Sequence, residues 1–454
     1  ILYQGNSRFY KMHHRSKGAK SRRKGRHVYR KSSSSSKRIK TKRDIHSFVG
    51  IRSESYISSE ERNEAKKPMK SRRTKGKGDR SNIRIALVGL GFGAEFIPIY
   101  LHHPDVESLT ICDNDVDVLD RIGDKFLIER RVADLQQIID SDNYDAVHLV
   151  TPIPLHAEQT IAVLESGKHC ACTVPMATNI EDLTAIVAAQ RRSGKNYMMM
   201  ETAVYTRHFL YVRDLVEREE MGRIQFLRGA HFQDMENWPP YWKGLPPMHY
   251  ATHAISPLLS LSGSRARKVC CFGSGVMREE LRRQYGNPYP IETAILELDR
   301  GNLSAEVTRS LFHTAREYTE SFTVYGEKVS FEWQQIEAED PVIFKMGQPQ
   351  TERGRPISVS RIVPPDRSDL LPEEIARFTK SGVYDEKNPH LSFIQGGGHG
   401  GSHPHLVHEF VTSITEGRAP RIDAITAADW TAPGICAHTS AMSGGELVTI
   451  SIFE

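Results

Sequence analysis

The sequence predicts a two-domain α/β protein, in which a doubly wound parallel sheet is followed by an α/β domain with an open, largely antiparallel sheet. Three observations lead to this prediction. The chain has 454 residues, which exceeds the size at which single hydrophobic cores stop growing. Between residues 82 and 203, short apolar runs alternate with helical patterns, as in a parallel sheet with crossover helices. Over residues 204–454 the apolar runs are longer and follow one another as hairpins, which indicates a second domain.

A strongly basic segment precedes these domains. Residues 1–82 hold 26 Lys and Arg against 6 Asp and Glu, a charge of +20, and the remaining 35 Lys and Arg and 50 Asp and Glu give the rest −15. A negative body excludes general nucleic-acid binding, because phosphate would repel it. Residues 1–81 have little apolar surface to bury, so we expect a disordered tail. It can bind RNA, target an organelle, or lie outside the working protein with Met69 as its true start; we favour the last alternative.

Cysteine content and hydropathy bear on the compartment. Six cysteines do not form a disulfide scaffold in a chain of this length, and the close pairs Cys170/Cys172 and Cys270/Cys271 lack zinc-site spacing. No apolar run approaches the roughly 18 residues of a membrane span. We therefore expect a soluble cytoplasmic protein that does not bind a membrane.

A glycine-rich turn follows the first predicted strand. Residues 83–88 form a nearly continuous apolar run, typical of a strand buried on both faces of a parallel sheet. The run leads into Gly89-Leu-Gly-Phe-Gly-Ala94, which matches a dinucleotide fingerprint of tight turn, close pyrophosphate approach and helix packing. A helix is expected over residues 94–102, bent at Pro98. We predict that the cofactor contacts Gly89, Gly91, Phe92 and Gly93.

An acid follows the second strand, expected over residues 108–112. Asp113 lies 20 residues beyond Gly93, where a carboxylate hydrogen-bonds the ribose 2′-hydroxyl. Asp115 and Asp117 add negative charge and no Lys or Arg follows at once, so a 2′-phosphate is disfavoured. The pattern favours NAD over NADP. The alternative is that Asp113 does no more than cap a turn.

The remaining elements follow in order. Strands and helices are expected to complete the first domain over residues 126–132, 134–140, 144–150, 155–166, 168–174, 180–193 and 196–200. In the second domain we expect strands over residues 224–232, 268–276, 292–298, 303–311, 321–325 and 328–333, and helices near 406–414 and 424–440.

The succession of motifs resembles the Gfo/Idh/MocA oxidoreductases, named for glucose–fructose oxidoreductase and inositol dehydrogenase. Besides the glycine-rich turn, it includes Thr151-Pro-Ile-Pro-Leu-His156, Gly167-Lys-His169 and Pro175-Met-Ala177. The resemblance covers residues 83 to about 450 and implies a Rossmann domain that binds NAD, with Thr151, Pro152 and His156 near the nicotinamide. It also implies hydride transfer to or from a sugar or cyclitol, and a homo-oligomer formed through the sheet of the second domain.

One position departs from this family. Typical members have Glu-Lys-Pro where this chain has Thr173-Val174-Pro175, and the family lysine helps to position and ionise the reacting hydroxyl. Valine cannot donate a hydrogen bond or carry a charge, so this role is vacant. Lys243 is a candidate to supply the ammonium group from another loop.

A histidine pair marks the candidate catalytic segment, His249-Tyr-Ala-Thr-His253. Pro257 lacks an N–H and fits best in the first turn of a helix, which predicts a helix start near His253. A helix N-terminus disfavours imidazolium, so we expect a neutral His253 near pH 7, the form that a base requires. The resemblance implies that His253 accepts the substrate proton, and we expect His249 and Tyr250 to assist.

Further side chains are candidates for the substrate side. Residues 396–405 read Gly-Gly-Gly-His-Gly-Gly-Ser-His-Pro-His, and the glycines indicate a loop that passes close to substrate or cofactor. We expect no metal site, because no carboxylate or cysteine joins these histidines at a recognisable spacing. Aromatic rings can stack on a sugar. The predicted substrate contacts are Tyr205, Arg207, His231, Trp242, His399 and His403.

Three functional classes fit the sequence. The first is an NAD-dependent oxidoreductase of a sugar or cyclitol. The second is suggested by residues 198–205, Val174-Pro175 and Tyr250-x-Thr-His253, which resemble the NAD-dependent glycosidases acting on α-N-acetylgalactosaminides; those enzymes retain NAD through oxidation, elimination and reduction. The third is a non-catalytic NAD-binding sensor, because the family also contains regulators.

Overall fold

The computed structural model of the chain describes residues 82–238, 244–349, 353–394 and 399–454. The expected basic tail and the predicted substrate residue Trp242 lie outside these residues, as does Lys243. Two sheets, both with helices packed on them, contribute side chains to one continuous hydrophobic core.

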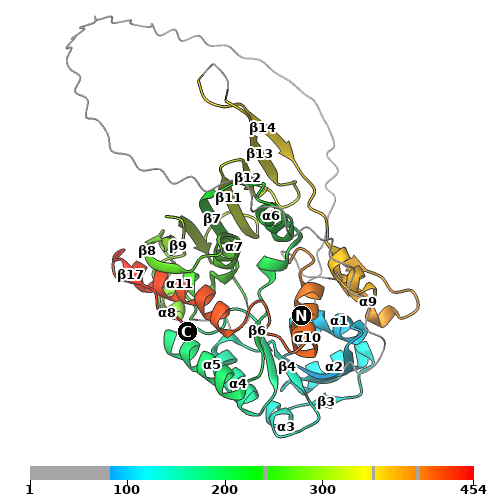
Figure 1. Cartoon of the computed structure of the whole chain (residues 1–454). Coiled ribbons are helices and arrows are strands. Elements are labelled where there is room, and N and C mark those ends of the chain that lie inside the picture. Colours follow the sequence, from blue (N-terminus) through cyan, green and yellow to red (C-terminus); the bar gives the residue numbers. More distant parts are fainter. Residues whose placement is uncertain (1–81, 239–243, 350–352, 395–398) are drawn as a thin grey trace, which may run out of the picture. The chain divides into compact units, whose positions relative to one another are not determined.

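The first sheet has six parallel strands in the order β3-β2-β1-β4-β5-β6, with helices on both faces (Figure 1). Its strands are β1 Ile83–Val88, β2 Val106–Cys112, β3 Arg131–Val132, β4 Ala146–Leu149, β5 His169–Cys172 and β6 Tyr197–Met199. Its helices are α1 Ile97–His102, α2 Val116–Phe126, α3 Leu135–Ile139, α4 His156–Glu165 and α5 Ile180–Ser193. The strand order reverses between β1 and β4, which is where open α/β sheets bind their ligands.

The predicted strand and helix order of this sheet is confirmed, with two local corrections. The helix expected over residues 94–102 is a 3-10 turn, η1 Gly93–Phe96, followed by α1. Pro98 stands in the first turn of α1, where its missing N–H has no intrahelical partner, so the proline does not bend the helix. The strand expected over residues 126–132 shortens to β3, because α2 extends to Phe126 and ends at Leu127 in a left-handed conformation (φ 56°).

The second sheet has nine strands in the order β14-β13-β12-β11-β7-β10-β9-β8-β17. They are β7 Ile224–Phe232, β8 Ala266–Ser274, β9 Ile291–Leu298, β10 Ser304–Ser310, β11 Thr319–Gly326, β12 Val329–Glu332, β13 Val342–Met346, β14 Ile357–Arg361 and β17 Val448–Thr449. All neighbours are antiparallel except β7 and β10, which are parallel. The expectation of a largely antiparallel open sheet is therefore confirmed.

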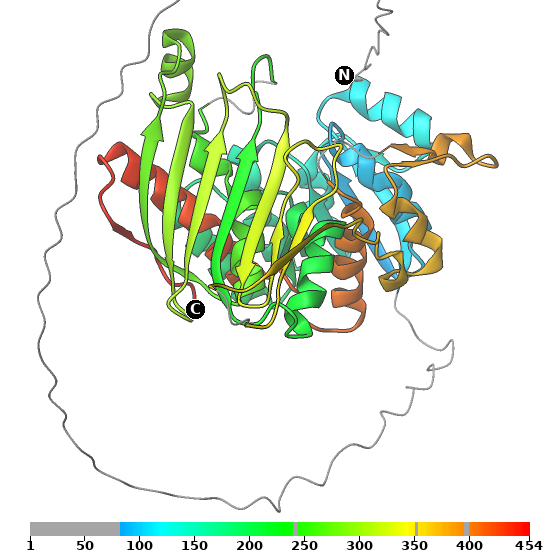
Figure 2. The ribbon, with the colours of Figure 1, turned by 90° about the horizontal axis from the view of Figure 1, so that it is seen from above.

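Helices cover one face of this second sheet. Helix α7 Thr252–Ser262 packs on β7, β10 and β11, and helix α11 Ala424–Met442 packs on β8 and β9. No helix within the described residues crosses the opposite face (Figure 2). A Cβ atom at Gly229 of β7 would collide with the carbonyl oxygen of Ala254, so this glycine lets the beginning of α7 approach the sheet closely.

The strand register places four ionisable residues in one row. Glu320 of β11 pairs with His231 of β7, His231 pairs with Arg309 of β10, and Arg309 pairs with Glu292 of β9. All four side chains are buried. Because side chains alternate between the two faces of a strand, the row lies on the inner face, beneath α7.

Several elements were not expected from the sequence. They are α6 Arg207–Glu217, α8 Glu279–Tyr285, β13, β14, and the short elements η6 Ser368–Leu370, α9 Glu373–Ala376, η7 Arg377–Thr379, β15 Gly382–Val383, η8 Pro389–Leu391 and β16 Phe393–Ile394. Strand β14 is exposed along its whole length, so it lacks the alternation of buried and exposed residues by which strands are found. Helix α10 His403–Thr415 packs against α1 of the first sheet.

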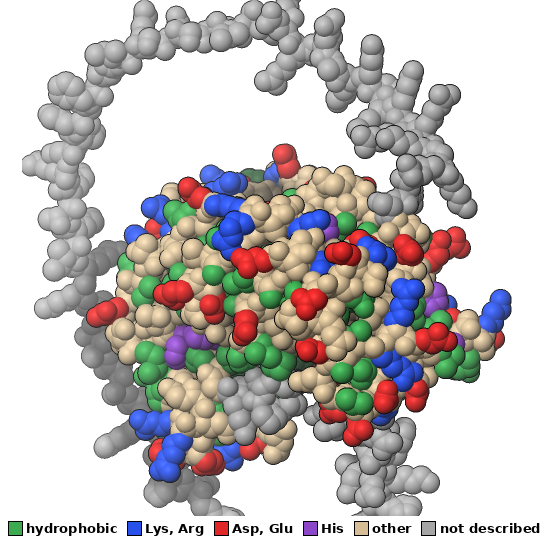
Figure 3. All heavy atoms as spheres, turned by 90° about the horizontal axis from the view of Figure 1, so that it is seen from below, with side chains coloured by type: hydrophobic (Ala, Val, Ile, Leu, Met, Phe, Trp, Pro, Cys, Tyr) green, Lys and Arg blue, Asp and Glu red, His purple; other side chains and the backbone are tan. Residues whose placement is uncertain are grey.

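The surface and the helices carry two further observations. On the face shown in Figure 3, Lys and Arg side chains lie interspersed with Asp and Glu side chains.

Across the described ranges, no helix has both the length and the apolar composition that crossing a membrane requires.

Candidate active site

The glycine-rich turn joins β1 to η1 at the edge where the strand order reverses. Gly89 has φ +89°, and a Cβ there would collide with the carbonyl oxygen of Val150 after β4. A Cβ at Gly91 would meet nothing within 4 Å, and one at Gly93 would lie 3.3 Å from the Val150 side chain. Gly89 thus makes the tight turn, Gly91 leaves room for a ligand against the backbone, and Gly93 permits close packing.

Asp113 directly follows β2 and lies beside this turn. Its Oδ2 accepts a hydrogen bond from the Leu90 N–H (2.7 Å), and its Oδ1 accepts one from the Asp115 N–H (3.0 Å). The carboxylate therefore caps the turn, which is one of the two roles expected for Asp113; the other is to bind the ribose. Each oxygen retains a second lone pair, so the same carboxylate can also accept from a ribose hydroxyl. The open backbone at Gly91 and this fixed acid fit a dinucleotide without a 2′-phosphate.

Thr151, Pro152 and His156 follow β4 at the same edge of the sheet. The two ring nitrogens of His156 lie 2.8 Å from the Pro175 carbonyl oxygen and 3.0 Å from that of Thr151. The Thr151 hydroxyl donates to the Gln159 side chain (2.6 Å). Since His156 uses both nitrogens within the protein, it positions the two loops at residues 151 and 175, and these loops carry any contact with a nicotinamide.

Val174 is the residue that we expect from the sequence to stand at the position of the family lysine. Its side chain is only 7% exposed and belongs to the hydrophobic core, next to a cis peptide bond to Pro175. No ammonium group can therefore come from this position.

His253 is the second residue of α7, which begins at Thr252 as expected. Pro257 is the sixth residue, so its predicted place in the first turn is wrong; the helix continues past it without the hydrogen bond that a proline cannot donate. Nδ1 of His253 lies 2.6 Å from Oε1 of Glu201, and Nε2 lies 3.3 Å from the Tyr250 hydroxyl. Of the two residues expected to assist His253, Tyr250 thus lies next to it. The other ring nitrogen of His253 contacts Glu201, a carboxylate that the sequence did not single out.

His253 was expected to be neutral, but the residues around it favour the protonated ring. Burial lowers the pKa of His253, but the carboxylates of Glu201 and Glu320 raise it, and the pKa stands at about 9. A helix N-terminus acts against imidazolium by about 2 kcal/mol at most. Two buried carboxylates outweigh that effect, so the ring is protonated at pH 7 and the prediction of a neutral ring is wrong.

A second carboxylate, Glu320, lies at the other nitrogen of the ring. Its Oε1 is 3.8 Å from His253 Nε2 and 3.7 Å from His231 Nε2, and it accepts a hydrogen bond from the Tyr318 hydroxyl. The ring centroids of His231 and His253 are 5.5 Å apart. The predicted substrate residue His231 therefore belongs to the same cluster, which we name the His253 cluster: Glu201, His231, Tyr250, His253, Tyr318 and Glu320.

Arg309 donates hydrogen bonds to two residues of the His253 cluster. Its guanidinium is fully buried and donates to the carbonyl oxygens of Tyr250 (3.0 Å) and His231 (3.2 Å) and to the side chain of Gln233 (2.7 Å). It also lies 5.5 Å from the centroid of the Tyr250 ring. Because its donors are used inside the protein, Arg309 positions the loops that carry Tyr250 and His231 and compensates the buried carboxylates.

His249 does not join this cluster. Its ring lies 5.2 Å from that of His438 on α11, whose Nδ1 is 2.8 Å from Glu292. Burial, with a smaller contribution from His438, lowers the pKa of His249 to about 3. The 3-10 turn η5 Pro247–Tyr250 and the helix that follows direct His249 and His253 to different neighbours.

The described part of the histidine-rich segment begins at His399, which lies between the glycine-rich turn and the His253 cluster. The ring of Phe92, at the tip of the turn, is 5.3 Å from His399 and 5.5 Å from His403. Burial lowers the pKa of His399, and the charges of Glu320, His253 and Glu201 reach it as well. His403, at the start of α10, lies 3.5 Å from Glu95. His399 thus faces both halves of the site, and His403 faces the cofactor side.

The other predicted substrate residues within the described ranges, Tyr205 and Arg207, make contacts inside the protein. Tyr205 is buried and its ring stacks with His405 at 6.4 Å. Arg207 begins α6 and donates to the carbonyl oxygen of Thr379 (3.2 Å). Both contacts hold the second domain together. Within the described ranges, no group of three His, Cys, Asp or Glu residues is arranged to hold a metal ion.

Sequence reasoning missed Glu201, Arg309 and Glu320. Glu201 follows β6, and residues just after parallel strands line the ligand-binding edge of such a sheet, so this signal was present. Glu320 stands in register with the buried Phe322 and Val324 of β11, where an apolar residue is expected. An acid at an apolar position of a strand is a signal for a buried polar site.

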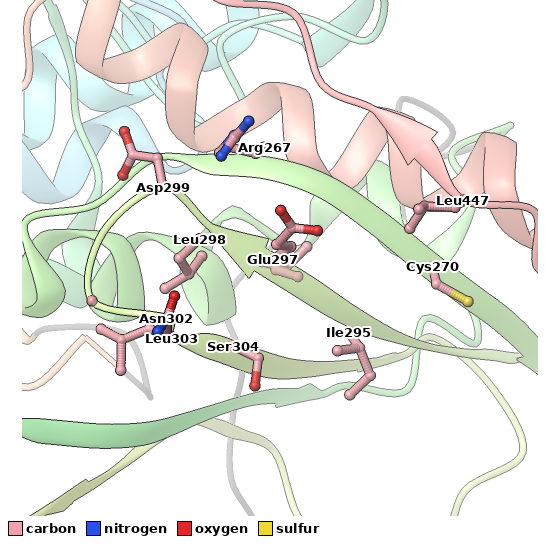
Figure 4. A pocket seen from close by; sticks show the side chains of 12 residues that line it. Arg267, Cys270, Ile295, Glu297, Leu298, Asp299, Asn302, Leu303, Ser304 and Leu447 are labelled. Carbon is pink, nitrogen blue, oxygen red and sulfur yellow. The ribbon is translucent and has the colours of Figure 1, made fainter. Parts of the chain in front are cut away.

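A separate cavity lies on the outer face of the second sheet. It has a volume of about 570 Å³ and is bounded by β8, β9, β10 and Leu447 (Figure 4). The side chains of Ile295 and Glu297 that line it alternate with the buried Leu296 and Leu298. It therefore lies on the face opposite α7 and is not part of the His253 cluster.

Comparison with protein families supports the first half of this site. Residues 83–201 match the oxidoreductase family with an NAD-binding Rossmann fold, Gfo/Idh/MocA. This match confirms the family resemblance, and with it the NAD-binding type of domain, over those residues.

Curated relatives match a limited part of the chain. A glycosyl hydrolase family 109 protein of Shewanella baltica is 29% identical over 198 residues, which cover 39% of this chain and 43% of the relative. An alpha-N-acetylgalactosaminidase of Shewanella oneidensis is 28% identical with the same coverage. The chain thus spans less than half the length of these relatives.

Solved structures share the fold over most of the chain. A levoglucosan dehydrogenase in complex with NADH and levoglucosan superposes with a TM-score of 0.65 at 20% identity, covering 81% of this chain and 99% of that one. A myo-inositol 2-dehydrogenase from Lactobacillus plantarum gives a TM-score of 0.62 at 17% identity, with coverage of 81% and 99%. At such identities the likeness establishes the fold.

Proposed function

We propose that this chain, whose residues 83–201 carry the NAD-binding Rossmann domain of the Gfo/Idh/MocA oxidoreductases, is an NAD-dependent oxidoreductase. It transfers hydrogen between the nicotinamide and a hydroxyl-bearing carbon of a sugar or cyclitol. The observation that supports this best is the position of His399, which touches Phe92 of the glycine-rich turn and faces the charges of the His253 cluster. A cluster of ionisable groups beside a dinucleotide turn is the equipment for oxidising an alcohol.

Residues 82–203 would hold the cofactor, and residues 204–454 would supply the substrate side. The backbone at Gly89, Gly91, Phe92 and Gly93 receives the pyrophosphate, Asp113 the ribose, and the loops at Thr151-Pro152 and Pro175 the nicotinamide. NAD is preferred over NADP because the fixed Asp113 carboxylate would repel a 2′-phosphate. When bound, NAD supplies an acceptor for the hydrogen and the electron pair that leave the reacting carbon.

The His253 cluster takes the place of the absent lysine. The imidazolium of His253 and the Tyr250 hydroxyl lie side by side at 3.3 Å and can both donate to the oxygen of the reacting carbon. A positive charge at this oxygen favours its ionisation, which is the work that the family lysine performs elsewhere. Glu201 keeps that charge on the ring from the other side.

A second candidate function is an NAD-retaining glycoside hydrolase. Two points favour it: the relatives named above as glycosyl hydrolases match 198 residues of this chain, and Val174 stands where the family resemblance leads us to expect the dehydrogenase lysine. The same cluster would serve the temporary oxidation of a ring hydroxyl. The two candidates differ in whether NADH accumulates with product.

The outer face of the second sheet would bind a second copy of the chain. This face exposes apolar side chains: Phe272 of β8 is 59% exposed, and Ile295, which lines the cavity of Figure 4, is 47% exposed. Such a patch is typical of a protein interface. All six cysteines are free thiols, which supports a reducing, cytoplasmic location.

The decisive experiment uses the full chain. The purified protein is analysed for bound NAD and assayed with levoglucosan, myo-inositol, glucose and 4-nitrophenyl α-N-acetylgalactosaminide. An oxidoreductase forms NADH in proportion to oxidised product; a glycosidase releases nitrophenol without net NADH. Bound NAD with neither reaction supports the non-catalytic sensor instead, and failure to bind NAD contradicts all three functions.

A further inference from the structure

Two carboxylates contact the two nitrogens of the His253 ring, and they differ in what else they touch. Glu201 is completely buried, and its Oε1 serves both His253 (2.6 Å) and the Ala203 N–H (2.8 Å). Glu320 lies at Nε2, the nitrogen that also faces the Tyr250 hydroxyl. The reacting oxygen has to meet Nε2 and Tyr250, so Glu320 stands on the substrate side of the ring and Glu201 behind it.

One oxygen of Glu320 is available for a ligand. Oε1 is engaged by Tyr318 and lies near both His231 and His253, whereas Oε2 is buried and has no hydrogen-bond partner among the described residues. The ring nitrogens of His231, which is fully buried, likewise lack such partners in the described ranges. A buried carboxylate oxygen without a donor costs free energy unless something else supplies one. A substrate hydroxyl is a donor of the required kind.

We propose that Glu320, rather than the imidazole of His253, accepts the proton of the reacting hydroxyl; this inference rests on the proposed oxidation of an alcohol. The O–H bond of the substrate breaks and its proton passes to Oε2 of Glu320, which becomes a neutral carboxylic acid. The C–H bond of the same carbon breaks, and its hydrogen leaves with both electrons to oxidised nicotinamide. The alcohol becomes a ketone and the nicotinamide is reduced, so atoms and electrons balance.

The charge of His253 supports this assignment. A ring that stays protonated between two carboxylates cannot take up another proton, but it can stabilise the alkoxide that forms as the hydroxyl proton leaves. The raised pKa of His253, about 9, agrees with this picture. His253 thus keeps its proton during the step. Oε2 of Glu201 and Oε2 of Glu320 both lack a hydrogen-bond partner among the described residues, and Glu320 is the carboxylate on the Nε2 side of the ring, where the reacting oxygen is placed.

Groups from every side face Glu320 and share its electrostatic field. They lie just before β11, on β7, on β10, on α7 and the turn before it, in the segment after β6, in the loop before α10 and in the segment after β12. They are Tyr318, His231, Arg309, His253, Tyr250, Glu201, His399 and Glu337. The titration measured below therefore belongs to the cluster, and the variants isolate the part of Glu320.

The first test needs no substrate. Histidine rings of the full chain are labelled with nitrogen-15, the His253 signal is identified by its absence in His253→Gln, and its protonation is followed by NMR between pH 5 and pH 10. We expect imidazolium at pH 7.5 in the wild type, and in Glu320→Gln a midpoint lower by about one pH unit or more, since an opposite charge is lost. A His253 ring that is neutral at pH 7.5 in the wild type overturns the proposal.

The second test measures turnover with whichever of levoglucosan, myo-inositol, glucose or the nitrophenyl glycoside is converted. Glu320→Gln keeps the size and an acceptor for Tyr318 but cannot take a proton, so kcat should fall about 100-fold or more while the Kd of NADH stays unchanged. Formate added to Glu320→Ala should restore part of kcat. The matched control is Glu306→Gln, which changes a partly exposed carboxylate on β10 that pairs with Arg228.

The outcomes separate this inference from the proposed function. A Glu320→Gln enzyme within threefold of the wild-type kcat, or a Glu320→Ala enzyme that formate does not activate, contradicts the role of Glu320 while leaving the oxidoreductase intact. A wild type that converts none of the four compounds and binds no NAD contradicts the proposed function itself. In that event the nitrogen-15 titration still decides whether the carboxylate of Glu320 holds the charge of His253.

Discussion

The two halves of the candidate site are built in opposite ways. The cofactor half comes from one short stretch, residues 83–113, completed by the loops after β4 and β5. The proton-handling half comes from Glu201, β7, α7, β10, β11 and the loop before α10, which are far apart in the sequence. A backbone turn depends on its own residues, whereas the charge of a side chain depends on every group around it. The first half is therefore the more predictable.

Two buried histidines, one in each half, show the same difference in their pKa values. His148 on β4 bonds the Tyr100 hydroxyl (3.1 Å), and burial lowers its pKa to about 3. His253 is equally buried, but two carboxylates raise its pKa to about 9. Burial alone makes a histidine neutral; a buried carboxylate at hydrogen-bond distance reverses the outcome.

The largest expected effect concerns His253. His253→Ala removes the imidazolium beside the reacting oxygen and leaves Glu201 buried without its partner, so kcat should fall about 10² to 10⁴-fold. The Kd of NADH should change little, because the cofactor half does not use this ring. Steady-state kinetics and cofactor titration measure both quantities. A variant that loses NADH binding together with turnover would contradict the separation of the two halves.

The glycine-rich turn offers a matched pair of substitutions. Gly89→Ala places a Cβ against the Val150 carbonyl in a left-handed conformation, so we expect a loss of about 2 kcal/mol or more in the free energy of unfolding. Gly91→Ala meets open space and should keep wild-type stability while weakening NADH binding, because the methyl group occupies the path of the pyrophosphate. Denaturant unfolding and NADH titration distinguish the two. Equal stability losses in both variants would show that the turn does not have this geometry.

A third prediction concerns His148 and the decrease in the free energy of unfolding at acid pH. The pKa of His148 is lower in the folded protein, about 3, than its ordinary value of 6.5, so protonation favours the unfolded chain. Its contribution to stability is complete above about pH 7 and is lost as the pH falls from 6.5 toward 3. His148→Gln should therefore reduce the stability loss between pH 7.5 and pH 5.5 by roughly 1 kcal/mol. Denaturant unfolding at both pH values checks this.

The control for that measurement is His390→Gln, a partly exposed histidine on η8. It should leave the pH dependence as in the wild type. If His148→Gln and His390→Gln behaved alike, burial of His148 would not be the cause of the acid sensitivity.

The smallest expected effect distinguishes the structure from the sequence-based hypothesis. His249 was expected to assist His253, but its ring packs against His438 on α11. His249→Ala should therefore change kcat less than about threefold, with a loss of stability typical of a partly buried side chain. A loss of kcat near that of His253→Ala would restore the original hypothesis.

Much of the fold follows from local patterns. Residues 83–88, 180–193 and 224–232 form the expected strand, helix and strand, because their apolar spacing matches the faces that they bury. Strand β14 and the short elements between residues 366 and 394 escaped prediction, since exposed strands and single turns carry no such spacing. The helix expected to bend at Pro98 begins near it instead, because a proline pattern does not reveal which turn of a helix it occupies.

By itself, the sequence determined the order of the parallel strands' motifs, the turn at Gly89 and the acid at Asp113, because each depends on residues within one supersecondary unit. It also identified His253 and Tyr250 as neighbours at a helix start. Only the tertiary structure decided that Glu201, Glu320, His231 and Arg309 surround that histidine. Strand register aligns Glu320, His231 and Arg309, and the packing of α7 brings His253 to Glu201 after β6 of the first sheet. The protonation of His253 is a property of that assembled field, and no local pattern contains it.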